Sequence, residues 1–360
     1  MEIKVTQAET NRTRPKDSDL GFGQVFTDHM FVMDYSEGKG WHDPQIVPYA
    51  DFSISPAAMV FHYGQAIFEG LKAYKTLDNL KVTRKKICLF RPRDNFERMN
   101  RSAKGMCIPQ LDIDFVMDAM KQLIRLEEKW IPETLGTSLY IRPTIIATDP
   151  FLGVRASFTY KFYIILSSVG AYYAEGLNPV KIWVSKDHVR AVRGGVGEFK
   201  TAGNYAASLI ASEEAKKDGY AQVLWLDAIE RKYIEEVGAM NIFFLINDEL
   251  VTPDLTGSIL PGITRYSVIS LAKKWGMNIS ERKISIDEVF KAHEDGKLLE
   301  VFGSGTAAVI SPVGEIRYGE RTISIGDGTP GETSMKFYNA LTDIHYGKTQ
   351  DSGNWIESID

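Results

Sequence analysis

The sequence has little of what marks secreted, metal-binding or membrane-spanning proteins. Its 360 residues include two cysteines, Cys88 and Cys107, whose spacing matches neither a metal site nor a redox motif. Two thiols in so long a chain are typical of a reducing compartment. The longest apolar runs, such as 242–246, are far shorter than the roughly 20 residues that span a bilayer. Residues 1–20 lack the apolar core of a signal peptide, so we expect a cytoplasmic protein with no membrane segment.

An excess of one charge is also missing. Lys and Arg number 42 against 47 Asp and Glu, which gives a net charge of −5, and no block of like charge occurs. A chain with this balance has no strong field to attract a polyanion, so no nucleic-acid partner is expected. The remaining composition, with 44% hydrophobic and 25% charged residues, is that of an ordinary globular protein.

The length and the pattern predict two domains. A chain of 360 residues exceeds the commonest size of a single domain. Strand-like and helix-like segments alternate in both halves, which favours a mixed α/β (α+β) fold. A short irregular run with Gly176 and Pro179 is the best linker candidate. We therefore predict a smaller N-terminal α/β domain at 1–172, a linker at 173–180 and a larger C-terminal domain at 181–360.

Apolar periodicity predicts the main elements of each half. In the first half these are a strand pair within 21–35, a helix near Ala57 that turns at Gly70 into a strand, a helix capped by Asp94, an amphipathic helix at 113–130, and strands at 137–148 and 160–170. In the second half they are a strand at 180–185, a helix at 207–219, a strand at 221–227, hairpins within 232–253 turning at Asn247 and Asp248, a helix after Pro261 and Gly262, and strands around a glycine turn within 298–319.

Residues 193–205, RGGVGEFKTAGNY, place Lys200 among four glycines. Ordering a glycine costs more backbone entropy than ordering any other residue. Four glycines around one lysine therefore need an explanation other than a solvent-exposed amine. A lone lysine is most often a surface residue. Here small neighbours would let a flat ligand approach, and a confined amine can have its pKa lowered enough to act as a nucleophile. A nucleotide-binding P-loop is disfavoured because this lysine follows Phe199 instead of glycine.

Two later segments suit an anion. In LPGITRYS, Pro261 and Gly262 lead into a helix whose first N–H groups, at Ile263 and Thr264, have no partner within the helix. In FGSGTAA, two glycines allow a tight turn at which Thr306 offers donors. Each segment alone is more often a structural cap or turn. Together with Lys200 they indicate a phosphorylated cofactor that condenses with an amine, namely pyridoxal 5′-phosphate.

This cofactor also needs a carboxylate beside its pyridine nitrogen. The segment IEEVGAMN offers Glu235 and Glu236 on a predicted strand. Neighbours on a strand face opposite ways, so only one of them can point into a site. From the pattern alone, either glutamate could equally lie on a solvated face.

These motifs resemble a known family, the branched-chain-amino-acid aminotransferases of fold-type IV. The resemblance runs from GFGQVFTDHM to FYNALTDIHYG, nearly the whole chain. Its strongest pieces are HYGQAIFEGLKAY, LFRPRDNFERMNRSA, GTSLYIRP, GGVGEFKTAGNYAAS, QVLWLD, EEVGAMNIFF, LPGITR and EVFGSGTAAVISPV.

The resemblance implies a fold and an activity. The fold would be a two-domain one with pyridoxal 5′-phosphate at the domain interface and a C-terminal domain that binds the cofactor. The activity would be reversible ping-pong transamination between L-leucine, L-isoleucine or L-valine and 2-oxoglutarate, which gives branched 2-oxo acids and L-glutamate in biosynthesis or degradation. Family members pair as homodimers in which a loop of one subunit helps close the other's site.

The resemblance also implies roles for individual residues. Lys200 would form the Schiff base and move the substrate's α-proton, while Glu236 would pair with the pyridine nitrogen and Tyr205 with the phenolic oxygen. The implied phosphate contacts are Arg98, the backbone of Ile263 and Thr264, and Thr306. The implied substrate pocket has a wall of Phe22, Tyr63, Tyr140, Val154 and Tyr172, with Arg142 for the glutamate carboxylate and the turn of Thr306 and Ala307 for the α-carboxylate. Without the resemblance, core packing and a surface ion pair would be the better explanations of the aromatic residues and Arg142.

The sequence departs from the family pattern twice. Mammalian members carry a C-x-x-C thiol switch where this chain has Ala308 and Ser311, so redox control of that kind is not expected. They also have a threonine that contacts the cofactor where this chain has Ala239, which leaves that hydrogen bond absent or replaced by water. No metal site is expected.

Two alternatives stay open at this level. Another fold-type IV enzyme, a D-amino-acid aminotransferase or an aminodeoxychorismate lyase, would use the same cofactor, but such relatives are shorter and are not expected to share GTSLYIRP and FTDHM. A non-catalytic protein that binds a phosphorylated ligand would use the same two anion-binding turns, and Lys200 would then be dispensable.

Overall fold

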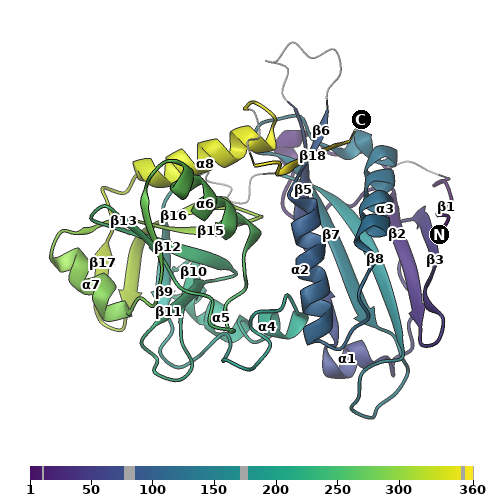
Figure 1. Ribbon diagram of the computed structural model, residues 1–360, viewed down its shortest axis with the longest axis horizontal. Helices are drawn as coiled ribbons and strands as arrows, with labels where there is room; N and C mark the ends of the chain where they lie inside the picture. The colour runs from purple at the N-terminus through teal and green to yellow at the C-terminus, as the bar shows by residue number, and fades with distance from the viewer. Residues whose placement is uncertain (10–11, 77–85, 171–176, 350–352, 360) are drawn as a thin grey trace. The chain divides into compact units, whose positions relative to one another are not determined.

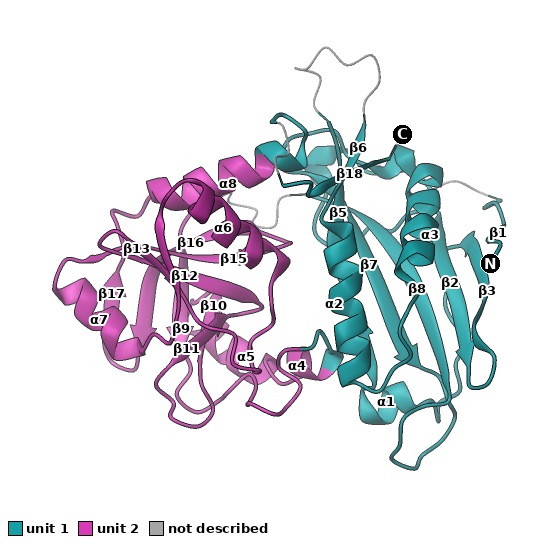
Figure 2. Cartoon of the chain, in the orientation of Figure 1, with its two compact units in different colours: residues 1–172, 199–202, 343–360 teal, residues 173–198, 203–342 magenta. Residues whose placement is uncertain are grey.

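The computed structural model describes residues 1–9, 12–76, 86–170, 177–349 and 353–359. It divides into two compact units (Figure 2). Unit 1 comprises residues 1–172, 199–202 and 343–360, and unit 2 comprises residues 173–198 and 203–342. Both units combine strands with helices, which confirms the predicted mixed α/β class. Of the predicted linker at 173–180, residues 173–176 lie outside the described residues, and a strand begins at Val180.

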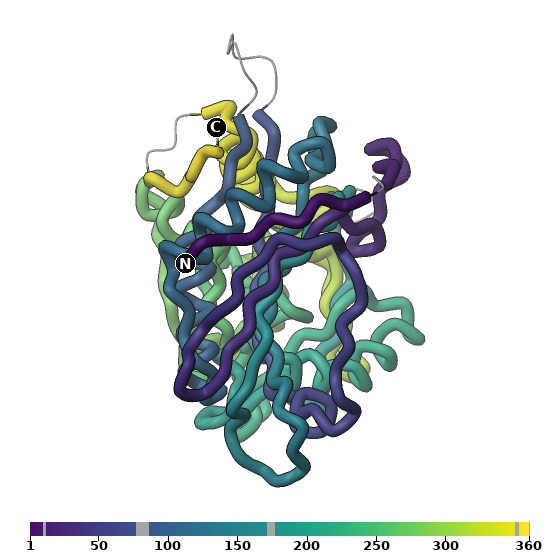
Figure 3. The backbone as a smooth tube through the Cα atoms, turned by 90° about the vertical axis from the view of Figure 1, so that its right-hand side faces the viewer, coloured from purple at the N-terminus to yellow at the C-terminus, as the bar shows by residue number. Residues whose placement is uncertain are grey.

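Unit 1 is built on a single sheet that, within the described residues, has nine strands (Figure 1). Their order is β1 (Lys4–Val5), β3 (Gly40–Pro48), β2 (His29–Ser36), β8 (Thr159–Val169), β7 (Ser138–Ala147), β5 (Leu71–Lys75), β6 (Ile87–Phe90) and β18 (Ile356–Ile359), with β4 (Ala66–Phe68) paired to β7. In Figure 3 the purple N-terminal strands lie beside the teal β8, in line with the antiparallel pairing of β2 and β8. The predicted strands at 137–148 and 160–170 are therefore confirmed as β7 and β8.

Helices α2 (Pro92–Gly105) and α3 (Ile113–Leu126) cover one face of this sheet (Figure 1). The amphipathic pattern of α3 is confirmed, because Val116, Met120 and Leu123 are fully buried in the core shared with the strands. Its first turn is capped by Asp112, whose carboxylate accepts a hydrogen bond from the Phe115 N–H at 3.2 Å.

The predicted cap of α2 is wrong. The helix begins at Pro92, so Asp94 lies inside its first turn, where it accepts a hydrogen bond from Arg91 Nε at 2.5 Å. Proline is well suited to the first helical position because its fixed φ matches the helix and its missing N–H would have no partner there. The cap position falls on Arg91, which has a left-handed backbone with φ of 48°.

The strand pair predicted within 21–35 is also only partly correct. The strand β2 begins at His29, and its partner β3 lies outside the predicted range. Phe26 makes an isolated bridge with Ser167 instead of belonging to a strand. Downstream, the predicted helix near Ala57 is the short α1 (Met59–Tyr63), which ends at Gly64 in a left-handed conformation with φ of 60°.

Unit 2 contains a sheet that closes on itself. Its order is β11 (Ile234–Val237), β10 (Gln222–Leu226), β9 (Val180–Val184), β16 (Val309–Tyr318), β15 (Leu298–Gly305), β12 (Met240–Ile246), β13 (Glu249–Thr252) and β14 (Asn278–Glu281), with β17 (Arg321–Ser324) paired to β16. Because β11 pairs with β12 as well as with β10, the strands from β11 to β12 form a closed ring. Side chains such as Leu224, Ile242 and Phe244 form the core of the unit.

The helices of the second half agree in part with the predictions. α5 (Leu209–Lys217) is followed by Gly219 at φ of 82°, and α6 (Ile263–Lys274) follows Gly262, both as predicted. The short α4 (Ala202–Ala206), α7 (Ile286–Glu294) and α8 (Glu332–His345) have no counterpart among the predicted elements. Across the described ranges, no helix is long and apolar enough to cross a membrane.

Candidate active site

Lys200 is held by unit 1 although it lies in the second half of the chain. Its N–H donates to Ser102 Oγ on α2 at 2.9 Å, and its carbonyl accepts from the Phe68 N–H at 3.1 Å. The next residue, Thr201, forms a bridge with Ile67 and donates its hydroxyl hydrogen to the Ala66 carbonyl at 2.8 Å. Residues 199–202 thus attach to β4 as a short additional strand segment, and the backbone of the lysine is fixed on both sides.

The aromatic ring of Phe68 lies against two cations. Lys200 Nζ is 5.2 Å and the Arg142 guanidinium carbon is 4.6 Å from the ring centroid. Arg142 Nη2 also donates to the Tyr140 hydroxyl at 3.0 Å, and Tyr140 makes an edge contact with Phe22 at 5.1 Å between centroids. Three of the predicted pocket residues, Phe22, Tyr140 and Arg142, therefore form one cluster.

Two features of this cluster could not be predicted from the sequence. Phe68 joins the two cations, but in the sequence it is one apolar residue among many. Lys72 lies opposite Tyr140 on the neighbouring strand, and burial lowers the pKa of its amine to about 8. A Cβ at Gly70 would collide with the Tyr140 hydroxyl, so only glycine leaves room for that ring.

Arg98 on α2 is paired with a residue that sequence reasoning missed. Its Nε and Nη2 donate to the two carboxylate oxygens of Glu69 at 2.7 and 2.8 Å. Both side chains are buried, with exposed fractions of 5% and 0%. This bidentate pair fixes the plane of the guanidinium.

Two other predicted wall residues, Tyr63 and Val154, are exposed in the single chain. Tyr63 and Val154 are 39% and 85% exposed, and the Tyr63 hydroxyl donates to the Leu152 carbonyl. The neighbouring Phe61 and Leu152 are also exposed, each by 63%. The Tyr63–Leu152 hydrogen bond joins α1 to the 152–154 segment, and we call the exposed apolar residues Tyr63, Leu152 and Val154 the α1 face. Tyr172 lies outside the described residues.

In unit 2, Glu236 lies at the centre of a second group. It is 2% exposed on β11, and one of its oxygens lies 2.8 Å from Arg190 Nη1. Its other oxygen accepts from Asn241 Nδ2 at 3.2 Å. Arg190 and Asn241 were not predicted, because an isolated arginine and an asparagine on a buried strand carry no motif.

The two neighbouring glutamates face different partners, as the strand geometry requires. Glu235 accepts a hydrogen bond from Ser258 Oγ at 2.5 Å. Burial raises the pKa of the Glu235 carboxyl, against the opposing effects of the Ser258 hydrogen bond and Arg190. The Ser258 carbonyl accepts from Arg190 Nη1 at 3.0 Å, so Ser258 and Arg190 connect the two carboxylates.

The first turn of α6 lies beside Asn241. A Cβ at Gly262 would collide with the Asn241 side-chain oxygen, which explains why the cap is glycine. No side chain caps this helix, and the first hydrogen bond within it runs from the Tyr266 N–H to the Gly262 carbonyl. The N–H groups of Ile263 and Thr264 precede that bond, as the sequence predicts for an anion-binding helix start.

The turn of Thr306 and Ala307 connects β15 to β16 in the same sheet. Ser304, two residues before the turn, is in register with Asn241 on β12. Among the described residues the buried Ser304 hydroxyl has no hydrogen-bond partner. After the turn, Val309 has a positive φ of 63°, which is unusual for a β-branched residue and typical of strain at functional positions.

The glycines near Lys200 serve the backbone. Gly194 has a positive φ of 79°, and a Cβ at Gly197 would collide with the Ser258 carbonyl. Arg190 also donates to the Gly197 carbonyl at 3.4 Å. Tyr205 on α4 is half-buried, and its own carbonyl accepts the Ser208 hydroxyl hydrogen at 2.8 Å.

These residues fit pyridoxal 5′-phosphate. Unit 2 combines a buried carboxylate suited to a pyridinium with a helix start and an unpartnered hydroxyl suited to a phosphate. Unit 1 presents a lysine amine beside an aromatic ring and an arginine. Each unit thus carries groups that suit part of the cofactor.

Comparisons with known proteins define the class. The family model "Amino-transferase class IV" matches residues 66–316. The branched-chain-amino-acid aminotransferase 2 of Bacillus subtilis is 57% identical, with 99% of this chain and 97% of that protein covered. The Escherichia coli branched-chain amino acid aminotransferase structure has a TM-score of 0.75 and 30% identity over 92% of this chain and 99% of its own. Another solved branched-chain amino acid aminotransferase, complexed with N-(5′-phosphopyridoxyl)-L-glutamate, has a TM-score of 0.72 and 25% identity over 92% of this chain and 98% of its own.

The chain is thus an aminotransferase of class IV that depends on pyridoxal 5′-phosphate. Within that class it belongs to the branched-chain-amino-acid aminotransferase family, and the resemblance identified from the motifs is confirmed.

Proposed function

We propose that the enzyme transfers the amino group of L-leucine, L-isoleucine or L-valine to 2-oxoglutarate, reversibly and by a ping-pong mechanism. The observation that carries the proposal is the Arg142 guanidinium within an aromatic cluster, 4.6 Å from the Phe68 ring and 3.0 Å from the Tyr140 hydroxyl. An apolar wall suits a branched side chain, and a partly buried guanidinium suits the second carboxylate of glutamate. One pocket can thereby accept both classes of substrate.

The proposed cofactor contacts follow the groups described above. Lys200 would hold the cofactor covalently, Glu236 would pair with the pyridine nitrogen, and Tyr205 would bond the phenolic oxygen. The phosphate would be bound by Arg98, by the N–H groups of Ile263 and Thr264, and by Thr306. When bound, the cofactor supplies an electron sink for the charge that forms on the α-carbon.

The chain's own residues carry the remaining steps. Lys200 Nζ would accept the proton of the substrate's α-carbon and pass it on within the same half-reaction, and in the second half-reaction it would deliver a proton to the α-carbon of the product. Arg190 and Asn241 each contact one carboxylate oxygen of Glu236 and hold the side chain in place. The α-carboxylate would lie at Thr306 and Ala307, and Phe22, Tyr140 and Arg142 would orient the side chain.

The enzyme is proposed to act as a homodimer. Tyr63 and Val154 are exposed on the α1 face, although the family resemblance assigns both to the substrate wall. Exposed contiguous apolar faces mark interaction sites. A second copy on this face would bury the two residues and bring them to the partner's site.

The test is formation of L-glutamate from L-leucine and 2-oxoglutarate by the purified enzyme, together with its visible absorption. We expect a coloured, active protein, and Lys200→Ala should lose the lysine-bound absorption and at least about 10³-fold of the activity. The exposed Lys216→Ala is the matched control. A colourless, inactive protein would refute the role of Lys200, whereas activity on D-alanine alone would favour the D-amino-acid aminotransferase alternative.

A further inference from the structure

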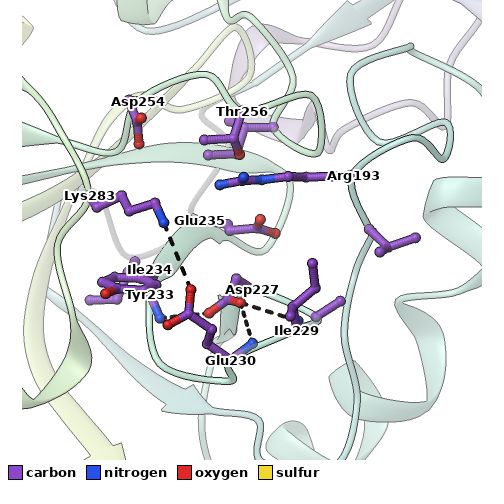
Figure 4. A pocket seen from close by; sticks show the side chains of 13 residues that line it. Arg193, Asp227, Ile229, Glu230, Tyr233, Ile234, Glu235, Asp254, Thr256 and Lys283 are labelled. Atoms are coloured by element: carbon purple, nitrogen blue, oxygen red, sulfur yellow. Dashed lines mark hydrogen bonds and ion pairs between the residues drawn. The ribbon is translucent and has the colours of Figure 1, made fainter.

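A pocket in unit 2 has no role in the chemistry above. It lies beside the side chain of Glu235, whereas Glu236 is paired with Arg190 and Asn241 (Figure 4). Its walls come from the 192–193 loop, the turn after β10, the 254–259 segment and Lys283. The pocket is small and partly open to solvent.

Two side chains of opposite charge in this pocket, Arg193 and Asp254, make no close ion pair within the described residues, although the charge of Arg193 opposes the burial-driven rise in the pKa of Glu235. Arg193 is exposed and Asp254 is half-buried, and neither side chain makes a hydrogen bond or ion pair with another residue in the described part of the chain. Figure 4 shows Arg193 and Lys283 pointing inward from opposite sides, with Glu235 and Thr256 between them. Lys283 is only weakly paired, at 3.8 Å from Glu230.

Another carboxylate that lines the pocket is already hydrogen-bonded within the protein. Asp227 accepts hydrogen bonds from the N–H groups of Ile229, Glu230, Lys232 and Tyr233, so it holds the turn together. What remains for a ligand is two cationic side chains on opposite sides of the pocket, Arg193 and Lys283, and two carboxylates, Glu235 and Asp254.

The rest of the lining is aliphatic. Val192, Ile229 and Ile259 line the pocket, and Ile229 is 72% exposed, which is unusual for an isoleucine without a partner. A ligand that satisfies this lining carries one carboxylate, one ammonium group and a short aliphatic body.

We propose that this pocket is a second binding site for an aliphatic α-amino acid as its zwitterion. The carboxylate binds Arg193, the ammonium group binds Glu235 and Asp254, and the side chain packs on Ile229 and Ile259. Ser258 is hydrogen-bonded to both Glu235 and Arg190, and Arg190 is paired with Glu236. A ligand that binds Glu235 therefore also changes the surroundings of Glu236. The binding itself does not depend on the substrates proposed above.

The experiment is calorimetric titration of the holoenzyme after borohydride reduction of its lysine–cofactor bond, which blocks turnover. Three probes of similar aliphatic shape are compared: L-leucine, 3-methylbutylamine without the carboxylate, and 4-methylpentanoate without the ammonium group. We expect L-leucine to bind about tenfold or more tightly than either analogue, because each analogue loses one charge-assisted contact.

Substitutions at the pocket then locate the site. Arg193→Gln should weaken L-leucine binding about tenfold, Arg193→Lys should retain most of it, and the exposed Lys291→Gln on α7 should leave it unchanged. All of these side chains are at or near the surface, so circular dichroism should report intact folds. Equal binding of the amine alone, unchanged binding in Arg193→Gln, or no heat with L-leucine at millimolar concentration would each overturn the proposal. A protein without a lysine-linked cofactor would contradict the proposed function instead, and the same titration would still test the pocket.

Discussion

Arg98 and Glu69 form a bidentate ion pair that is buried on both sides, with N–O distances of 2.7 and 2.8 Å. The pair joins α2 to the segment between β4 and β5, 29 residues apart in the sequence. A guanidinium at this depth needs its counter-charge, because removing one partner of a buried pair leaves an uncompensated charge.

Replacing Glu69 should therefore destabilise the protein strongly. We expect Glu69→Ala to lower the free energy of unfolding by about 3–5 kcal/mol in urea titrations. The matched control is Asp114→Ala. Asp114 pairs at 2.6 Å with Arg93, which lies on the same helix as Arg98, but the side chains of Arg93 and Asp114 are 54% and 81% exposed. The control should change stability little, since exposed ion pairs are weak. Equal losses in the two variants would contradict the structural role of the buried pair.

The position of Arg142 predicts a selective change in substrate use. Arg142→Met removes the guanidinium and keeps an apolar side chain against Phe68. We expect the KM for 2-oxoglutarate to rise about 10- to 100-fold, the value of one charge-assisted contact. The single-turnover rate of the enzyme with L-leucine should change far less. Arg321→Met, which removes an exposed arginine that lies over Phe290 and Tyr318 in unit 2, is the control and should alter neither the KM nor the single-turnover rate. An equal loss in both half-reactions would exclude a role specific to glutamate.

Asp17 should give the protein a pH-dependent part of its stability. Partial burial would raise the pKa of this carboxyl, but hydrogen bonds from Arg14, the Thr134 hydroxyl and the N–H groups of Glu133 and Thr134 outweigh it and lower the pKa to about 2. A carboxyl whose pKa is lower in the folded state stabilises the protein above its unfolded pKa, here 3.8, and loses that effect as the pH falls to about 2.

The test of this prediction compares the wild type with Asp17→Asn by urea titration at several pH values. The difference in unfolding free energy should be constant above pH about 5 and should shrink between pH about 4 and 2. Asp118→Asn, on the exposed side of α3, should produce no such pH-dependent difference. A wild-type advantage that persists undiminished at pH 2 would refute the assignment to Asp17.

The α1 face should control the oligomeric state. Val154→Lys places a charge on a residue that is 85% exposed in one chain, so the folded monomer should tolerate it. We expect a sedimentation-derived mass near that of one 40.4 kDa chain, together with loss of activity. Leu135→Lys, at another exposed apolar residue of unit 1, is the control and should stay dimeric. A dimeric Val154→Lys protein would place the interface elsewhere.

Local patterns in the sequence predict the elements whose signal lies within one turn or one strand. The buried stripe of α3, the glycine before α6 and the apolar runs of β7 and β8 are all of this kind. The predicted cap of α2 was wrong. Aspartate is a residue type that commonly caps helices, which favoured Asp94, but Pro92 determines where the helix begins.

Partnerships between distant residues could not be predicted. Arg98 and Arg190 carry charge, but their positions do not reveal that Glu69 and Glu236 are the partners. The family resemblance supplied Tyr63 and Val154 as wall residues without indicating that both are exposed in one chain. Such pairings depend on how strands are ordered in the sheet, which no short window of sequence contains.

The backbone of Lys200 is bonded on both sides, to Ser102 through its N–H and to Phe68 through its carbonyl. During turnover the amine can therefore move only by rotation about its own side-chain bonds, which takes far less time than rearrangement of a loop. The amine can therefore leave the cofactor and return to it without any rearrangement of residues 199–202. The amide hydrogen of Lys200 should accordingly exchange slowly with deuterium whether or not the enzyme is turning over, so the reactive atom is mobile while its anchor is among the better protected parts of the chain.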